Sequence, residues 1–230
     1  MRTGGRSILG VQSSEHTSLH RGPGALILAS ASPRRADILR GAGLTFDVLP
    51  SNVDEDALES NRAPAEVAVR LALAKARAIA AQHTESTVIG ADTLVVLDGE
   101  MLGKPGDDAE TRSMLTRLRG RHHEVITGVA AVAGATVLSG FRRTRVLMRE
   151  YGTAEVETYI RSGLPRDKAG AYGIQDRHFS PVASVEGCRL NVVGLPLCLL
   201  GELLRQVAEG FTAKNLECPG CPVQRMAAAR

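Results

Sequence analysis

The chain has 230 residues, of which 43% are hydrophobic, 23% charged and only 3% aromatic, and its formal net charge is +3 at pH 7. This composition allows a sizeable core, excludes a chain that is disordered throughout, and argues against a surface that stacks nucleic-acid bases on aromatic rings. No run approaches the ~18 apolar residues of a membrane span, and the polar start at 1–23 lacks the apolar segment of a secretory signal. We therefore expect a cytoplasmic protein with no membrane or nucleic-acid partner.

Strand and helix signals alternate along the chain. Strands are expected at 25–29, 45–49, 87–97, 124–133 and 136–148, and a hairpin is expected at 182–193 around Glu186-Gly187. Helices are expected at 36–41, 64–83, 107–119, 153–162 and 195–208. This order predicts a mixed α/β fold. One domain is expected at 25–210, between a disordered extension at 1–24 and a flexible tail at 211–230 that adds little to the core.

The most informative motif is Ser30-Ala-Ser-Pro-Arg-Arg35, which joins the first strand to the first helix. Ser32 is a natural N-cap, and the following proline suits the first helical position. Arg34 and Arg35 then lie in the first turn, where the helix dipole favours negative charge. An anion such as a phosphate chain would explain two cations there. The alternative is a capped helix with two solvated arginines.

Asp92 is a second anomaly, because its carboxylate interrupts the apolar strand at 87–97. A buried lone charge costs several kcal/mol unless it is paired or binds a metal. One explanation is a structural ion pair with a nearby cation. The other is a general base or a ligand of a hard cation such as Mg²⁺.

Several further charges lie beside glycines, turns or packed helix faces. Lys75 lies on the apolar face of the long helix, Lys104 in Gly103-Lys-Pro105, and Lys168 in Asp167-Lys-Ala-Gly170. Each lysine alone is typical of a solvated surface charge, but together with the two arginines they can neutralise a triphosphate. Glu55 adds a second acid, and two acids with several cations indicate metal-assisted phosphoryl chemistry.

Seven blocks of this sequence, in this order, resemble the Maf family of nucleoside triphosphate pyrophosphatases. They are Leu28–Arg35, Asp54-Glu55, Leu71–Ala76, Ile89–Thr93, Leu102–Pro105, Asp167–Gln175 and Val192–Pro196. The resemblance covers about residues 25–208. It implies a two-lobed mixed α/β fold similar to that of inosine triphosphate pyrophosphatases, with the active site in the central cleft.

The resemblance also implies a reaction and the residues that perform it. The reaction is hydrolysis of a nucleoside triphosphate to the monophosphate and pyrophosphate with a divalent cation, Mg²⁺ or Mn²⁺. The catalytic positions of the family match Asp92, as proton acceptor, Lys104 and Glu55, and Glu55 and Asp92 match its metal ligands. The substrate-binding positions match Ser32, Arg34, Arg35, Lys75, Thr93, Lys168 and Gln175.

The form Ala171-Tyr-Gly-Ile-Gln175 is similar to the branch of the family that acts on dTTP and UTP. Two departures bear on substrate choice: Asp176 replaces a usual glycine, and Leu164-Pro165-Arg166 replaces a usual Glu-Pro before Asp167. The alternative function is a nucleotide-binding regulator of division or septum formation with little turnover. A homodimer is left open.

Cysteine usage leaves one feature without a role. Cys218 and Cys221 form a Cys-x-x-Cys motif in the tail, which is half of a zinc site or a redox pair. No second pair with zinc spacing occurs in the chain, and Cys188 and Cys198 are expected to be reduced core residues. Two thiols in a loose tail are therefore expected.

Overall fold

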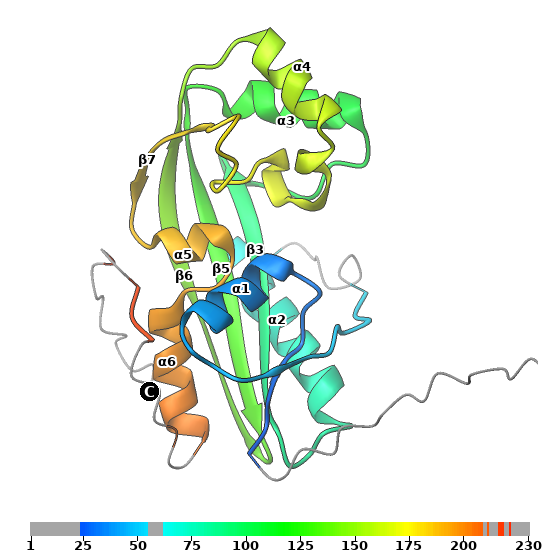
Figure 1. Ribbon diagram of the computed structural model, residues 1–230, viewed down its shortest axis with the longest axis vertical. Coiled ribbons are helices and arrows are strands. Elements are labelled where there is room, and N and C mark those ends of the chain that lie inside the picture. The colour runs from blue at the N-terminus through cyan, green and yellow to red at the C-terminus, as the bar shows by residue number, and fades with distance from the viewer. Residues whose placement is uncertain (1–23, 55–61, 209–210, 212–215, 219–220, 222–230) are drawn as a thin grey trace, which may run out of the picture.

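Three long strands form the centre of the molecule (Figure 1). The computed structural model describes residues 24–54, 62–208, 211, 216–218 and 221. Within this part of the chain, seven strands form one mixed sheet in the order β2-β1-β3-β5-β6-β7, with β4 paired to β3. The strands are β1 Leu26–Leu28, β2 Asp47–Val48, β3 Thr87–Leu97, β4 Glu100–Leu102, β5 His122–Ala133, β6 Thr136–Met148 and β7 Val182–Glu186. Strand β1 is parallel to β2 and β3, and the other pairs are antiparallel.

Helices gather at both ends of the long strands (Figure 1). They are α1 Pro33–Gly41, α2 Pro64–Ala80, α3 Asp108–Leu118, α4 Thr153–Arg161, α5 Arg189–Val193 and α6 Leu197–Val207, with 3₁₀ helices η2 Leu164–Asp167 and η3 Ala169–Ala171. The upper lobe comprises α3, α4, η2 and η3 on the sheet, and the lower lobe comprises α1, α2, α5 and α6. The predicted two-lobed α/β fold is confirmed.

The alternation of side chains along β3 creates a gap between the lobes. Ile89 and Ala91 belong to the lower core with α1 and α6, whereas Val95 and Leu97 belong to the upper core with α3 and α4. Successive odd-numbered residues of a strand point to the same face. Thr93 therefore lies on this face between the two cores, where a cleft can form.

Helix α2 covers the opposite face and packs very closely on the sheet. A Cβ at Gly90 would lie 2.0 Å from the Ala72 carbonyl oxygen, and one at Gly128 would lie 2.2 Å from the Ala68 carbonyl oxygen. Only glycine allows a helix to approach a sheet this closely. This approach brings Lys75 of α2 beside the strand that carries Asp92.

At the end of β1, the helices that follow in the chain pack on opposite faces of the sheet. Strand β1 lies between β2 and β3, helix α1 packs on the face of Ile89, and α2 packs on the face of Val88. In open α/β sheets, ligands bind outside the carboxyl end of strands at such a switch point. The Ser30–Arg35 motif begins there.

The predicted hairpin at 182–193 is wrong. Strand β7 is its first half, but Gly187, at φ +126°, leads into helix α5 instead of a second strand. The side chain of Asn191 explains the helix, because it is fully buried and donates to the Val125 carbonyl oxygen at 2.9 Å. A buried amide needs such partners, and the helical turn places it within reach of them.

The structure differs from the sequence analysis at two smaller points. The turn at Asp98-Gly99 is followed by β4, which sequence patterns did not predict. The expectation that the tail adds little to the core is wrong for Leu216 and Cys218, which are buried against α6. No helix among the described residues is long and apolar enough to cross a membrane.

Candidate active site

A cavity of about 610 Å³ lies between the lobes, within the size range of small-molecule sites. Nine of the ten predicted site residues line it: Ser32, Arg34, Arg35, Lys75, Asp92, Thr93, Lys104, Lys168 and Gln175. The tenth, Glu55, lies outside the described residues. The sequence-predicted residues are therefore gathered from α1, α2, β3, the segment after β4, and the loops around η2 and η3.

The cleft has an excess of positive charge. Its described lining carries five cationic side chains and three carboxylates: Arg34, Arg35, Lys75, Lys104 and Lys168, and Asp92, Asp167 and Asp176. A cleft lined mainly by one sign of charge raises the local concentration of ligands of the opposite sign. An anionic ligand suits this arrangement.

Helix α1 begins at the wall of the cleft. Ser32 occupies the N-cap position as predicted, but its side chain makes no capping hydrogen bond. Ser30 instead accepts a hydrogen bond from the Ser32 backbone N–H, with 3.2 Å between Oγ and N. The first-turn N–H groups of α1 thus lack a side-chain cap, which suits them to an anionic ligand.

Arg35 is not a solvated arginine, as the simpler alternative supposed. Its Nε donates to the Gly194 carbonyl oxygen at 2.9 Å, Nη1 to Ser30 Oγ at 3.0 Å and Nη2 to Thr93 Oγ1 at 3.1 Å. Thr93 Oγ1 also lies 3.0 Å from Thr127 Oγ1. This network connects α1, β3 and the segment after α5, and fixes the floor of the cleft.

Arg34 spans the cleft to the upper lobe. Its Nη1 lies 2.8 Å from Asp167 Oδ2, and Lys168 Nζ lies 2.8 Å from the other oxygen of the same carboxylate. Partial burial opposes ionisation of Asp167, but hydrogen bonds from Lys168 and Arg34 outweigh it and lower the pKa of this carboxyl. Sequence reasoning missed Asp167 as a site residue, although it lies next to Lys168 in a quoted block.

Asp92 and Lys75 form a buried ion pair. Lys75 Nζ lies 2.6 Å from Asp92 Oδ1, and each side chain is only 8% exposed. The ion pair with a nearby cation, one of the two explanations for Asp92, is therefore present, and Lys75 is the cation. Both residues also line the cleft, so a ligand bound there can contact the carboxylate.

Asp176 does not strain the loop after Gln175. Its φ is not positive, and its carboxylate accepts a hydrogen bond from the Tyr159 hydroxyl. Burial, and then this carboxylate, raise the pKa of Tyr159. The charge that replaces the usual glycine is thus held by a neutral donor at the cleft wall, while Gln175 beside it is exposed.

The donor set fits a hard divalent cation. Mg²⁺ binds through one or two carboxylates together with substrate phosphates. Asp92 supplies a carboxylate with one oxygen on Lys75, in a cleft suited to phosphate. Asp167 is held by two cations and is less suited.

Known proteins share this sequence pattern over most of the chain. A family model described as "Maf-like protein" matches residues 25–207. A dTTP/UTP pyrophosphatase of Symbiobacterium thermophilum is 49% identical over 181 residues, covering 79% of this chain and 93% of the relative. Enzymes of the same name from Dictyoglomus thermophilum and Deinococcus radiodurans are 44% and 46% identical, covering 79% and 78% of this chain and 95% and 91% of the relatives.

Solved structures match less closely. A HAM1 protein from Coxiella burnetii is 16% identical with a TM-score of 0.41, covering 66% of this chain and 89% of that one. The Ham1 protein of Staphylococcus aureus is 17% identical with a TM-score of 0.40, and the match covers 56% of this chain and 74% of that one.

Proposed function

Since this chain belongs to the Maf family, we propose that it hydrolyses dTTP and UTP to the nucleoside monophosphate and pyrophosphate in the cleft between its lobes. Relatives at 44–49% identity carry this activity in their names and align over more than nine-tenths of their own length. The observation that carries the proposal is the buried Asp92 in a cleft that is otherwise rich in cations at the end of β1.

The triphosphate lies along the cationic wall in this proposal. Arg34 and Lys168 reach into the cleft from opposite lobes, and both contact Asp167. A phosphate chain offers them stronger and more numerous acceptors than one carboxylate. Lys104 adds a point charge from the segment after β4, and the first turn of α1 adds N–H donors.

Asp92 accepts the proton of the attacking water. The water oxygen forms a bond to the α-phosphorus, its proton passes to the Asp92 carboxylate, and the bond from the α-phosphorus to the bridging oxygen breaks as pyrophosphate leaves. Lys75 fixes the carboxylate through the 2.6 Å contact between Nζ and Oδ1. Asp92, with Glu55 from outside the described residues, would hold the divalent cation, which supplies charge neutralisation on the phosphates.

Two polar side chains of the cleft, Gln175 and Thr93, select the base in this proposal. The amide of Gln175 offers both a donor and an acceptor, which match the imide edge of uracil or thymine. Thr93, whose hydroxyl accepts a hydrogen bond from Arg35 at 3.1 Å, lines the same cleft. Val125, Tyr172 and Val192 add apolar surface to the same cleft.

A product assay tests this function. The full chain with Mg²⁺ or Mn²⁺ is given a panel of nucleoside triphosphates, and release is measured with and without inorganic pyrophosphatase. We expect phosphate only when the coupling enzyme is present, and faster release from dTTP and UTP than from ATP and GTP. Direct release of orthophosphate would refute the proposed reaction. Tight nucleotide binding without turnover would instead support the alternative, a nucleotide-binding regulator. The cytoplasmic location and a homodimer stay predictions.

A further inference from the structure

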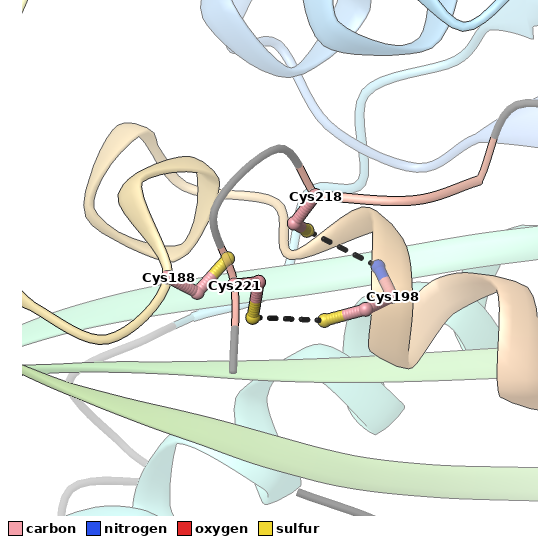
Figure 2. Close-up of side chains that lie close together, drawn as sticks. All are labelled: Cys188, Cys198, Cys218 and Cys221. Carbon is pink, nitrogen blue, oxygen red and sulfur yellow. Dashed lines mark hydrogen bonds between the residues drawn. The ribbon is translucent and has the colours of Figure 1, made fainter. Parts of the chain in front are cut away.

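All four cysteines of the chain meet at one place outside the cleft (Figure 2). Cys188 precedes α5, Cys198 lies in the first turn of α6, and Cys218 and Cys221 belong to the tail. Their Sγ atoms all lie within 4.8 Å of one another. The fold therefore supplies the second pair of thiols that the sequence spacing did not reveal.

The distances match a tetrahedral metal–thiolate centre. Zn–S bonds of about 2.3 Å at tetrahedral angles place neighbouring sulfurs about 3.8 Å apart. The Cys198 and Cys221 sulfurs are 3.8 Å apart, and the largest separation among the four is under 4.8 Å. A disulfide needs sulfurs at about 2.05 Å and would use only two of the four.

Backbone donors and a cation surround the sulfurs as they do in thiolate centres. The Cys198 N–H donates to Cys218 Sγ at 3.3 Å, and the Asn191 N–H donates to Cys188 Sγ at 3.4 Å. Arg142 supplies the cation, because its side chain hydrogen-bonds to Cys198. Such partners orient metal ligands and balance their charge.

We propose that these four cysteines bind one Zn²⁺ ion, which fastens the tail to α5 and α6. Four protein sulfurs fill the tetrahedral positions and leave no place for water or substrate, so the site is structural. The proposal does not rest on the function proposed for the cleft. It also explains why the tail packs closely: Leu216 is buried, and a Cβ at Gly201 of α6 would lie 2.8 Å from Leu216 Cβ.

The site has a mechanical connection to the cleft. Cys188 is the N-cap of α5, and the residue after α5, Gly194, accepts the hydrogen bond from Arg35 Nε at 2.9 Å. A metal at Cys188 therefore anchors one end of a five-residue helix whose other end touches the cleft floor.

Metal content of the full chain tests the proposal. The protein is purified under a phosphine reductant without chelators, and zinc and iron per chain are measured by mass spectrometry. Cys218→Ser and Cys221→Ser are compared with Glu217→Gln, an exposed neighbour without sulfur. We expect one zinc per chain in the wild type and in Glu217→Gln, and at least a tenfold lower content in each serine variant.

Two further measurements keep the test independent of how the variants fold. Cobalt substitution of the wild-type chain is expected to give sulfur-to-cobalt charge-transfer absorption and the intense visible bands of tetrahedral Co²⁺. A strong chelator is expected to lower the melting temperature of the wild type and to leave that of Cys218→Ser unchanged. Zinc at the level of the serine variants, iron in its place, or cobalt without thiolate absorption would each overturn the proposal.

Discussion

The buried pair of Asp92 and Lys75 allows its structural and catalytic roles to be separated. Asp92→Asn keeps the shape of the side chain and an oxygen that can accept from Lys75 Nζ, which lies 2.6 Å from Oδ1 in the wild type. It removes the carboxylate that is proposed to take the proton. We expect turnover to fall by about 10²–10⁴, the usual contribution of a general base.

The same substitution also costs stability, because each side chain of the pair is only 8% exposed. Removing one partner of a buried ion pair costs about 3–5 kcal/mol, since a charge is left without compensation. The retained amide oxygen places Asp92→Asn near the lower end, about 3 kcal/mol. By contrast, Glu100→Gln removes an exposed partner of Arg117, at 3.0 Å, and should leave the urea midpoint nearly unchanged.

A double substitution separates the two effects. In Asp92→Asn/Lys75→Met both charges are absent, and replacing a buried pair by neutral groups is often nearly neutral for stability. We expect the urea midpoint to recover most of the loss while turnover stays low. Steady-state pyrophosphate release and urea unfolding check this for the wild type, Asp92→Asn, Glu100→Gln and the double variant. Turnover that returns together with stability would show that Asp92 acts only through folding, and near-normal turnover of folded Asp92→Asn would refute the assignment outright.

Three other substitutions probe the site and its surroundings. Arg34→Lys replaces a guanidinium fork, which reaches Asp167 at 2.8 Å, by a point charge. KM for the triphosphate should therefore rise or kcat should fall, at nearly unchanged melting temperature. Equal kinetics of the two proteins would mean that Arg34 does not contact phosphate. Gln175→Glu loses the amide donor and should reduce the preference for dTTP and UTP over ATP and GTP, which a competition assay among the four nucleotides measures. Burial, and then His122, lower the pKa of His123 from 6.5 to about 4. The unfolded chain therefore binds the extra proton between these values, and stability present above pH 6.5 is lost as the pH falls towards 4, by up to about 3 kcal/mol. Unfolding midpoints of the wild type and His123→Gln across this range should converge at low pH, and parallel curves would contradict the assignment.

Elements with strong local patterns could be predicted from the sequence almost to the residue. The apolar, β-branched run at Thr87–Leu97 and the strand at Thr136–Met148 have the predicted bounds. The segment at 182–193 could not be predicted in this way, because Glu186-Gly187 indicates a turn but does not determine whether a strand or a helix comes next. Helix α5 depends on the burial of Asn191, a tertiary contact with no local signal.

The candidate site divides in the same way. Motif chemistry and family resemblance selected nine residues that line one cleft, but not their pairing, such as Lys75 with Asp92. The cysteine cluster was missed for a topological reason. Cys188 and Cys198 meet Cys218 and Cys221 because the tail packs against α6, where Leu216 and Cys218 are buried, and no spacing rule in one sequence reveals that contact.

The continuous sheet determines how this site can diversify. Strands β3 and β5 are paired from Thr87 and Ala133 to Val96 and Glu124, so Asp92 lies well inside one rigid ladder shared by both lobes. Arg34, by contrast, lies at a helix start and Gln175 in a loop. Loops accept substitutions and insertions more readily than paired strands do. Descendants of this chain can therefore acquire new nucleotide preferences by varying the rim while the reaction centre keeps its place.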